Sequence, residues 1–505
     1  MDFLDPKKER MMHTRLLIGY GLVALAIGIA TLVLLYQAYG YGIDRQGNVT
    51  QNGLLFVSSQ PAGATITLNG KPYKSNTNTR VVVPADTYTL QVSEAGYRTW
   101  QRQVVVSGGD VQHFDYPFLF PQTLQTTSLG DLAADPSVAL QSPDKRWLLV
   151  GQSESSGSFI QYDLKNPAQP AATQISLPPD MFTTGDSDGA QSWSLVEWAS
   201  DNRHALVLHT YTVKGTTDRE YILLDRDTPA DSVNITNNLS LSQTETVNLF
   251  DSKIDQYYVY DSGNQTLQRV NADDGSVVSS LSHILAFKPY ASDQLLYVTT
   301  QPPSGITTKS DVVTAVFQDG QKTIGLRTLP AGASSYDLNL AQYSGSWYVA
   351  VGATNDSAAY IYRDPQSQTV GADGFPAPWR RLPVSDPSFL SFSGNAQFLL
   401  AENGQDFVVY DLENVVQYHY HASAPIDQPQ LHATWMDGDR LLYVSGGKLV
   451  VFDYDYRNLQ TLVPANPVYP VFFSSDFSYL YALRAGSADG SAKPALTSTG
   501  LVIKH

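Results

Sequence analysis

The stretch Ser142-Pro143-Asp144-Lys145-Arg146-Trp147-Leu148-Leu149-Val150, residues 142–150, decides the architecture of most of this chain. It places a short polar turn directly before a strand of aromatic and aliphatic residues. Ser, Pro and Asp are typical of turns, whereas Trp, Leu and Val pack well in strands. The same pattern recurs to the end of the chain, which predicts a β repeat protein.

We count eight copies of the pattern, with centres roughly 40 to 57 residues apart, the length of a four-stranded propeller blade. Most copies also contain a third strand that ends in Asp, as at Asp163, Asp411 and Asp453. The turns after the first copy lie at Asp201, Asp251-Ser252, Ser292-Asp293, Ser344-Gly345, Ser393-Gly394-Asn395, Asp437-Gly438-Asp439 and Ser475-Asp476.

Residues 122–505 are therefore predicted to form a β-propeller, because stacking in a ring buries the faces that one blade leaves exposed. Eight blades are favoured; seven remain open, because the fifth unit is long and the third irregular. The last unit supplies only three strands, ending at residues 499–503. We assign residues 123–129 as the missing outer strand of blade eight. The repeats resemble the WD40-like repeats of periplasmic TolB-type propellers.

Residues 54–120 show alternating strands and a second resemblance. The motifs that carry it are Pro61-Ala62-Gly63-Ala64, Asn69-Gly70, Pro84 with Tyr88, Gly96-Tyr97 and Trp100. In this order and spacing they resemble the PEGA domain, a small β domain of bacterial and archaeal envelope proteins. Ala62 stands where the name-giving Glu would be, and Asp86 replaces a usual Gly. The resemblance implies a small β-sandwich-like domain in a bacterial envelope protein.

Residues 16–36, LLIGYGLVALAIGIATLVLLY, carry no charge. As a helix they span roughly 31 Å, enough to cross a bilayer. Lys7, Lys8, Arg10 and Arg15 precede them, whereas residues 37–53 carry only Arg45. The positive-inside rule then predicts that residues 1–15 are a cytoplasmic stub and that the bulk of the chain is extracytoplasmic. A cleaved signal peptide and a buried core helix are the alternatives. Residues 37–53, which lack an apolar period, are predicted to be a flexible stalk.

The composition excludes several function classes. The chain has a net charge of −16 and no cysteine. An acidic surface repels nucleic acid, and a chain without cysteine has no disulfide, no Cys-ligated zinc and no cysteine nucleophile. The sequence contains no G-x-S-x-G, H-E-x-x-H or phosphate-binding Gly-Lys-Ser/Thr motif. We therefore predict no catalytic, cofactor-binding or metal-binding residues and no cofactor.

Three weaker patterns are also considered as sites. His419 and His421 share one face of a strand, as a metal pair requires, but a polar outer face explains them better. Residues 185–189 and 271–275 superficially resemble calcium loops, yet they lack the later Glu and are more typical of hairpin turns. Exposed aromatic residues would suit a carbohydrate or peptide platform, although packing between blades accounts for most of them.

The favoured interpretation is a mainly β, membrane-anchored, extracytoplasmic and non-catalytic protein of the bacterial cell envelope. Its propeller is expected to bind an envelope protein or a cell-surface polymer. The alternatives are an extracytoplasmic propeller hydrolase or lyase with loop-borne catalytic residues, and a membrane assembly or sensory subunit. The longest predicted inserts, where propeller ligands often bind, are residues 183–191, 212–219, 302–310 and 371–379.

Overall fold

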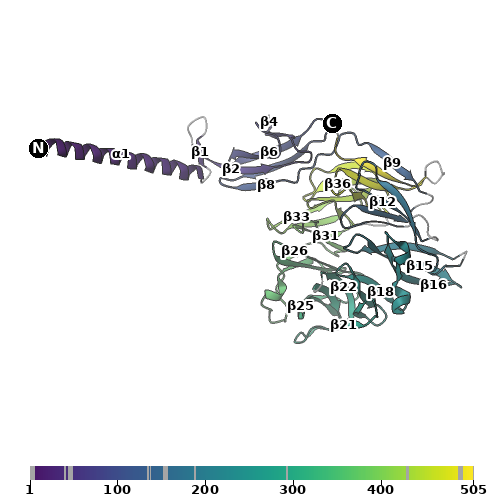
Figure 1. Cartoon of the computed structure of the whole chain (residues 1–505). Helices are drawn as coiled ribbons and strands as arrows, with labels where there is room; N and C mark the ends of the chain where they lie inside the picture. The colour runs from purple at the N-terminus through teal and green to yellow at the C-terminus, as the bar shows by residue number, and fades with distance from the viewer. Residues whose placement is uncertain are drawn as a thin grey trace, which may run out of the picture. The chain divides into compact units, whose positions relative to one another are not determined.

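The computed structural model describes residues 6–38, 41–43, 49–132, 136, 138–151, 157–186, 189–291, 294–427, 432–486 and 493–503. The chain divides into two compact units, residues 1–123 with 503–505 and residues 124–502. The described residues are mainly strand, as predicted, with one long helix near the N-terminus (Figure 1).

Helix α1 (Pro6–Ala38) contains the predicted apolar stretch. Its segment Met11–Tyr36 is long and apolar enough to cross a membrane, with a mean hydropathy of 2.4, and its side chains are exposed. The hydroxyl of Thr31 donates to the carbonyl of Ile27 at 2.8 Å. This polar group is therefore satisfied within the helix, as an apolar solvent requires. The helix is a candidate membrane anchor or signal sequence.

The first unit contains two four-stranded sheets. In one, β1-β2-β5 are antiparallel neighbours and β8 pairs parallel to β2; the other has the order β4-β3-β6-β7. Trp100 is 1% exposed and lies against Phe114, with ring centroids 6.4 Å apart, which joins a strand of each sheet. The strands are β1 (Tyr41–Ile43), β2 (Val49–Val57), β3 (Thr65–Leu68), β4 (Lys71–Pro72), β5 (Thr79–Pro84), β6 (Asp86–Ser93), β7 (Trp100–Val106) and β8 (Val111–Phe114).

The predicted flexible stalk over residues 37–53 differs from the structure. Helix α1 continues to Ala38, and residues 41–43 and 49–53 lie in strands β1 and β2. Tyr41 pairs with Gln51 in this ladder, and Asn52 pairs with Pro84 of β5. The segment is polar in composition, but its residues 41–43 and 49–53 pair with neighbouring strands through their backbone groups. The expected turn at Asn69-Gly70 is confirmed, because both residues have positive φ, 49° and 75°, between β3 and β4.

In the second unit the described residues form eight four-stranded antiparallel sheets, which we number as blades one to eight, in agreement with the favoured prediction. Blades one to four are β10 (Ala139–Gln141), β11 (Trp147–Gly151), β12 (Ser158–Asp163), β13 (Ala171–Ser176); β14 (Gln191–Trp198), β15 (His204–Val213), β16 (Thr216–Asp225), β17 (Val233–Asn234); β18 (Glu245–Phe250), β19 (Lys253–Asp261), β20 (Thr266–Asn271), β21 (Val277–Leu281); and β22 (Ile284–Tyr290), β23 (Gln294–Thr299), β24 (Val312–Asp319), β25 (Lys322–Pro330).

Blades five to eight continue the order along the chain. They are β26 (Tyr336–Tyr343), β27 (Ser346–Ala353), β28 (Ala359–Arg363), β29 (Arg380–Leu382); β30 (Phe389–Phe392), β31 (Phe398–Asn403), β32 (Asp406–Asp411), β33 (Val416–His421); β34 (Thr434–Trp435), β35 (Arg440–Ser445), β36 (Lys448–Asp453), β37 (Gln460–Pro464); and β38 (Phe472–Phe473), β39 (Tyr479–Arg484), β40 (Ala495–Gly500) with β9 (Thr126–Asp131). Helix α2 (Ile235–Leu239) and the 3-10 turns η1 (Pro229–Asp231) and η2 (Pro365–Ser367) lie in connections.

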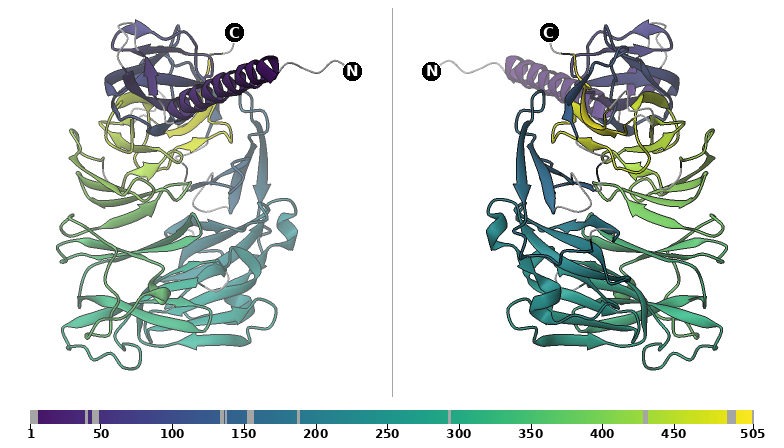
Figure 2. Two further views of the ribbon diagram at one scale, coloured as in Figure 1. Left: turned by 90° about the vertical axis from the view of Figure 1, so that its left-hand side faces the viewer. Right: turned by 90° about the vertical axis from the view of Figure 1, so that its right-hand side faces the viewer.

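Blade eight closes the ring as the sequence predicted. Strand β9, from the start of the second unit, pairs antiparallel with β40 at its end. In Figure 1 the blue β9 accordingly lies beside the yellow strands, and in Figure 2 the blades follow one another from blue through teal and green to yellow. The third strand of this blade spans Ala495–Gly500, earlier than the expected residues 499–503.

The core lies between neighbouring blades. One buried cluster joins blade one to blade two through residues such as Phe159 and Trp193, and further clusters join blades two to six in turn. Another joins blade eight to blade one through Tyr481 and Leu148, both 0% exposed. From blade eight through blade one to blade six, neighbouring blades therefore bury apolar faces against one another, which explains why the ring must be closed.

Candidate functional site

The strand order fixes which loops share a face of the propeller. The first strands of successive blades contact one another, β10 with β14, β14 with β18, β22 with β26 and β26 with β30, so these strands are innermost. In an antiparallel blade, the turns after strands one and three emerge on one side, which we name the hairpin face. The turns after strand two and the connections between blades emerge on the other, which we name the linker face.

Seven of the eight repeated turns of the sequence lie between the first and second strands of their blades, on the hairpin face; the eighth, Ser292 and Asp293, is outside the described residues. The Ser142 hydroxyl donates to Asp144 and accepts the backbone N–H of Trp147 at 2.9 Å. The pairs Ser393 with Asn395 and Ser474 with Asp476 repeat this arrangement. The repeated polar residues therefore fasten the turns.

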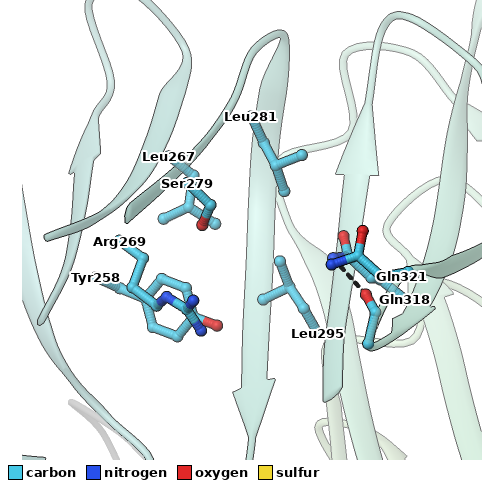
Figure 3. Close-up of a pocket in the computed structure, with 9 residues that line it drawn as sticks. Tyr258, Leu267, Arg269, Ser279, Leu281, Leu295, Gln318 and Gln321 are labelled. Carbon is cyan, nitrogen blue, oxygen red and sulfur yellow. Dashed lines mark hydrogen bonds between the residues drawn. The ribbon is translucent and has the colours of Figure 1, made fainter. Parts of the chain in front are cut away.

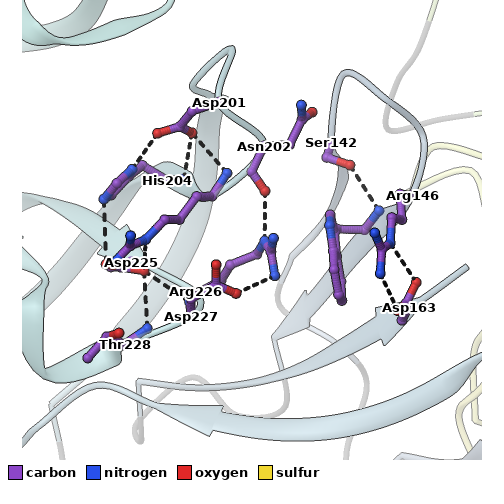
Figure 4. Close-up of polar contacts among 12 residues, drawn as sticks. Ser142, Arg146, Asp163, Asp201, Asn202, His204, Asp225, Arg226, Asp227 and Thr228 are labelled. Atoms are coloured by element: carbon purple, nitrogen blue, oxygen red, sulfur yellow. Dashed lines mark hydrogen bonds and ion pairs between the residues drawn. The ribbon is translucent and has the colours of Figure 1, made fainter. Parts of the chain in front are cut away.

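The aspartates that end third strands fasten the same face (Figure 4). Asp163 accepts two hydrogen bonds from Arg146, at 3.0 and 2.9 Å. Asp225, 1% exposed in its side chain, pairs with Arg203 and accepts the backbone N–H of Thr228 at 3.1 Å. Burial by itself would raise the pKa of Asp225, but these hydrogen bonds lower it to about 2. Asp163 and Asp225 are thus ionised structural groups.

A groove opens among the innermost strands of blades two, three and four. It has a volume of about 550 Å³, within the usual range for ligand pockets. Its polar lining includes Glu197, Asn248 and the exposed Lys288. Glu197 accepts the backbone N–H of Leu249 at 2.6 Å and an amide N–H of Asn248 at 3.5 Å. Burial raises the pKa of Glu197, while these hydrogen bonds and the charge of Lys288 act against the rise.

Two acidic side chains and a histidine lie at the linker-face ends of blades five and six. Glu402 is fully buried; it accepts the backbone N–H of Ala433 at 3.0 Å and lies 3.3 Å from Nδ1 of His432. The His432 ring stacks on Phe389 at 4.4 Å. Burial raises the pKa values of Glu402 and Asp337, and the hydrogen bond to Glu402 raises the pKa of His432.

A second glutamate–histidine pair, of which both members are buried, lies within blade two. His209 and Glu220 are 0% and 1% exposed, with Nδ1 and Oε1 2.9 Å apart. Glu220 also accepts the backbone N–H of Thr183 at 2.7 Å and an amide N–H of Asn234 at 2.8 Å. Burial would raise the pKa of Glu220, but these hydrogen bonds outweigh it and lower the pKa. The pair is enclosed by Trp193, which stacks on His209 at 4.1 Å, so we interpret it as structural.

Sequence reasoning missed both pairs. His209 and Glu220 pair across a hairpin, equally far from its turn at Lys214-Gly215, and that symmetry was a readable signal. No comparable signal connects Glu402 with His432, because His432 belongs to the connection before blade seven.

The weaker sequence patterns lie in ordinary structural positions. His419 and His421 are exposed on the outer strand β33, where His421 Nδ1 lies 2.8 Å from Asp406. Asp274, in the turn of residues 271–275, accepts the backbone N–H of Ser276 at 2.9 Å. In the other loop, of residues 185–189, residues 187–188 lie outside the described residues. Across the described chain, no group of three or more His, Asp or Glu side chains is placed to hold a metal ion.

The four long inserts meet in two pairs. In the first pair, the backbone N–H of Asp186 donates to the carbonyl of Thr212 at 2.8 Å. In the second, Ile306 contacts the loop of residues 371–379 at Gly374, beside Gly325 of β25. By strand order, residues 183–191, 212–219 and 302–310 leave from the linker face and residues 371–379 from the hairpin face. The inserts therefore do not form one cluster at one mouth.

Comparisons with known proteins give one family match and several distant structural likenesses. No curated protein matches the sequence. Among solved structures, the Dos1 propeller is 11% identical with a TM-score of 0.43 and covers 75% of this chain and 95% of its own. Dihydro-heme d1 dehydrogenase NirN, in complex with DHE, is 12% identical with a TM-score of 0.40 and covers 81% and 75%.

The β-propeller domain of Cps50 (Swd1) from Myceliophteria thermophila is 12% identical with a TM-score of 0.37 and covers 66% of this chain and 97% of its own. Likenesses of this size carry no argument about function. The family model that matches is the PEGA domain, over residues 52–119, close to the predicted 54–120. Residues 52–119 thus form a PEGA domain, and an eight-bladed propeller follows it in the chain.

Proposed function

We propose that this chain is a membrane-anchored, extracytoplasmic scaffold of the cell envelope, whose propeller binds a protein or polymer partner on the hairpin face. Helix α1 is the anchor in this proposal, with the basic residues before it in the cytoplasm. Strand β1 begins three residues after α1 ends, and the rings of Tyr36 and Tyr41 are 4.6 Å apart. The PEGA domain then begins at the membrane surface.

The observation that carries the proposal is the polar groove of about 550 Å³ among the innermost strands of blades two to four. Glu197 is held by two hydrogen bonds, and the exposed Lys288 offers a charge to a ligand. Beside the groove on the hairpin face, Asp201 accepts the backbone N–H of His204 at 3.0 Å in the turn of blade two, and the backbone N–H of Ser200 donates to the carbonyl of Ser252 in blade three at 2.7 Å. A fastened face loses little conformational entropy on binding, which favours a binding role.

Site-specific photocrosslinking tests this proposal in membranes of cells that express the full chain. A photoreactive phenylalanine analogue replaces Tyr290, which lines the groove and is 38% exposed. The control position is Val105 on strand β7 of the PEGA domain, which is 67% exposed. We expect a crosslinked partner from position 290 only, and a lower yield after Lys288→Glu. Equal crosslinking from both positions, or none from position 290, would contradict the proposal.

A second candidate function, an extracytoplasmic enzyme, is favoured by Glu402 and His432. A buried carboxyl with a raised pKa beside a half-buried histidine has the properties of a general acid. Incubation of the full-length protein with peptide and glycan mixtures tests this. Turnover that Glu402→Gln abolishes, in a variant with unchanged thermal unfolding, would replace the scaffold proposal.

A further inference from the structure

A pocket of about 130 Å³ lies between blades three and four, apart from the groove described above. Strands β20 and β21 supply one side, with Arg269 and Ser279, and the end of β24 with the turn that follows it supplies the other, with Gln318 and Gln321 (Figure 3). Leu281 and Leu295 lie between these polar sides. The pocket therefore combines an apolar wall with polar groups on two sides. It shares no lining residue with the groove.

Arg269 is the cation of this pocket. Its guanidinium lies over the ring of Phe250, 4.6 Å from the centroid. Its Nε is buried and has no hydrogen-bond partner. Within the described part of the chain, Arg269 forms no ion pair, whereas Arg146, Arg203 and Arg226 each pair with an aspartate. A buried donor without a partner costs free energy, and an anionic ligand would supply the missing acceptor.

The pocket holds a basic residue without an acidic one. The chain carries 48 Asp and Glu against 32 Lys and Arg, so acidic partners are abundant. The pocket nevertheless presents an arginine, a serine and two glutamine amides, and none of its lining residues is acidic. The amide of Gln318 is fixed by its hydrogen bond to the carbonyl of Gly320 at 3.0 Å. The geometry thus favours an external anion.

The volume of the pocket and the residues of its walls indicate which kind of anion fits. An apolar cavity of about 150 Å³ accommodates one benzene, so this pocket takes a group about the size of one side chain. The leucines favour a short aliphatic chain, and a guanidinium matches a carboxylate. We propose that the pocket binds a carboxylate on a short aliphatic chain, namely a glutamate side chain of a polypeptide partner. This site is independent of the proposed groove, and either can fail without the other.

Titration calorimetry on the full-length protein in detergent micelles tests the proposal with five probes. They are the peptide Ala-Ala-Glu-Ala-Ala with blocked ends, the same peptide with Gln in place of Glu, N-acetyl-glutamate amide, glutarate and inorganic phosphate. We expect the two glutamate compounds to bind at least tenfold more tightly than the Gln peptide and phosphate. Equal binding of the Glu and Gln peptides would overturn the carboxylate assignment, as would tighter binding of phosphate. Binding of glutarate without the Glu peptide would overturn the polypeptide source.

Two variants locate the binding. Arg269→Gln removes the positive charge of the pocket. Leu281→Trp fills the pocket and leaves the arginine at position 269 in place. Each should weaken binding of the Glu peptide at least tenfold. The control is Arg381→Gln, which makes the same charge change at an exposed arginine of β29 that donates to the Ser357 carbonyl at 3.1 Å. Thermal unfolding establishes which variants are folded. Undiminished binding by a folded Leu281→Trp or Arg269→Gln variant would overturn the proposal.

Discussion

The hydroxyl oxygens of Thr126 and Thr499 lie 2.8 Å apart, although 373 positions separate them in the sequence. They join β9 to β40 and so complete the sheet of blade eight. At the other end of this strand pair, the backbone N–H of Leu132 donates to the carbonyl of Pro494 at 2.8 Å. Since the chain has no cysteine, noncovalent contacts alone close the ring.

Leu132 is a direct probe of this closure. It is 1% exposed and belongs to the cluster that joins blade eight to blade one. We expect Leu132→Ala to lower the free energy of unfolding of the propeller by about 2–5 kcal/mol, because it leaves a cavity at the seam. Thermal or chemical denaturation of the full-length protein measures this.

Val277→Ala is the matched control for Leu132→Ala. Val277 is 54% exposed on an outer strand, so its truncation should change the free energy of unfolding by less than about 0.5 kcal/mol. Equal effects of the two substitutions would mean that the seam contributes little to the stability of the ring.

The turns and hairpins of the fold were predictable because residues that are close together in the sequence form them. The polar turn that contains Ser142 and Asp144 is the first copy of a pattern that recurs along the chain. That pattern located the hairpin between the first two strands of the blades. The stalk prediction differs from the structure because residues 49–51 pair with β1 and residues 52–53 pair with distant β5, which polar composition does not reveal. The groove was not predicted either: Glu197, Asn248 and Lys288 come from three blades, and only ring geometry brings them together.

Gly325 tests the contact between two of the inserts. A Cβ at this position would lie 2.5 Å from Cδ1 of Ile306 and 3.3 Å from Cε1 of Phe375. Gly325→Ala should therefore displace Ile306 and loosen the loop of residues 302–310, with a cost of about 1–3 kcal/mol for overpacking. Limited proteolysis should then cleave this loop faster than in the parent protein.

Gly345→Ala is a useful comparison for Gly325→Ala, because the two glycines differ in kind. Gly345 has a φ of 78° and no neighbour near its Cβ position, so Ala is strained there by backbone conformation alone. This variant should lose stability without faster cleavage at residues 302–310. Unchanged cleavage of that loop in Gly325→Ala would show that Ile306 does not hold it.

The anchor proposal predicts a defined topology. Four basic residues precede residues 16–36 of α1, whereas only Arg45 follows them before the PEGA domain, so residues 1–15 should remain in the cytoplasm. Protease added to spheroplasts that express the full chain should digest the propeller and spare an N-terminal epitope. Protection of residues 122–505 would reverse the topology, and release of the propeller without α1 would support a cleaved signal sequence.

The two buried glutamates predict opposite dependences of stability on pH. Burial raises the pKa of Glu402 above its ordinary 4.5, and its hydrogen bond raises the pKa of His432 above 6.5. The folded state therefore keeps protons that the unfolded state releases, and the stability that these groups contribute is lost as pH rises above these values. The pKa of Glu220 is lowered, so its contribution is present above pH 4.5 and is lost as pH falls below it.

Glu402→Gln and Glu220→Gln separate these contributions, because glutamine keeps the shape of the side chain without titrating. Relative to the parent protein, Glu402→Gln should gain stability as pH rises from 5 to 8, since it no longer releases a proton on unfolding. Glu220→Gln should be most destabilised near pH 7, where the parent carries an ionised Glu220 held by three residues, and its deficit should shrink as pH falls below 4.5. Denaturant unfolding of the full-length variants across this pH range measures both trends, and parallel curves for the two variants would show that neither pKa shift is coupled to folding.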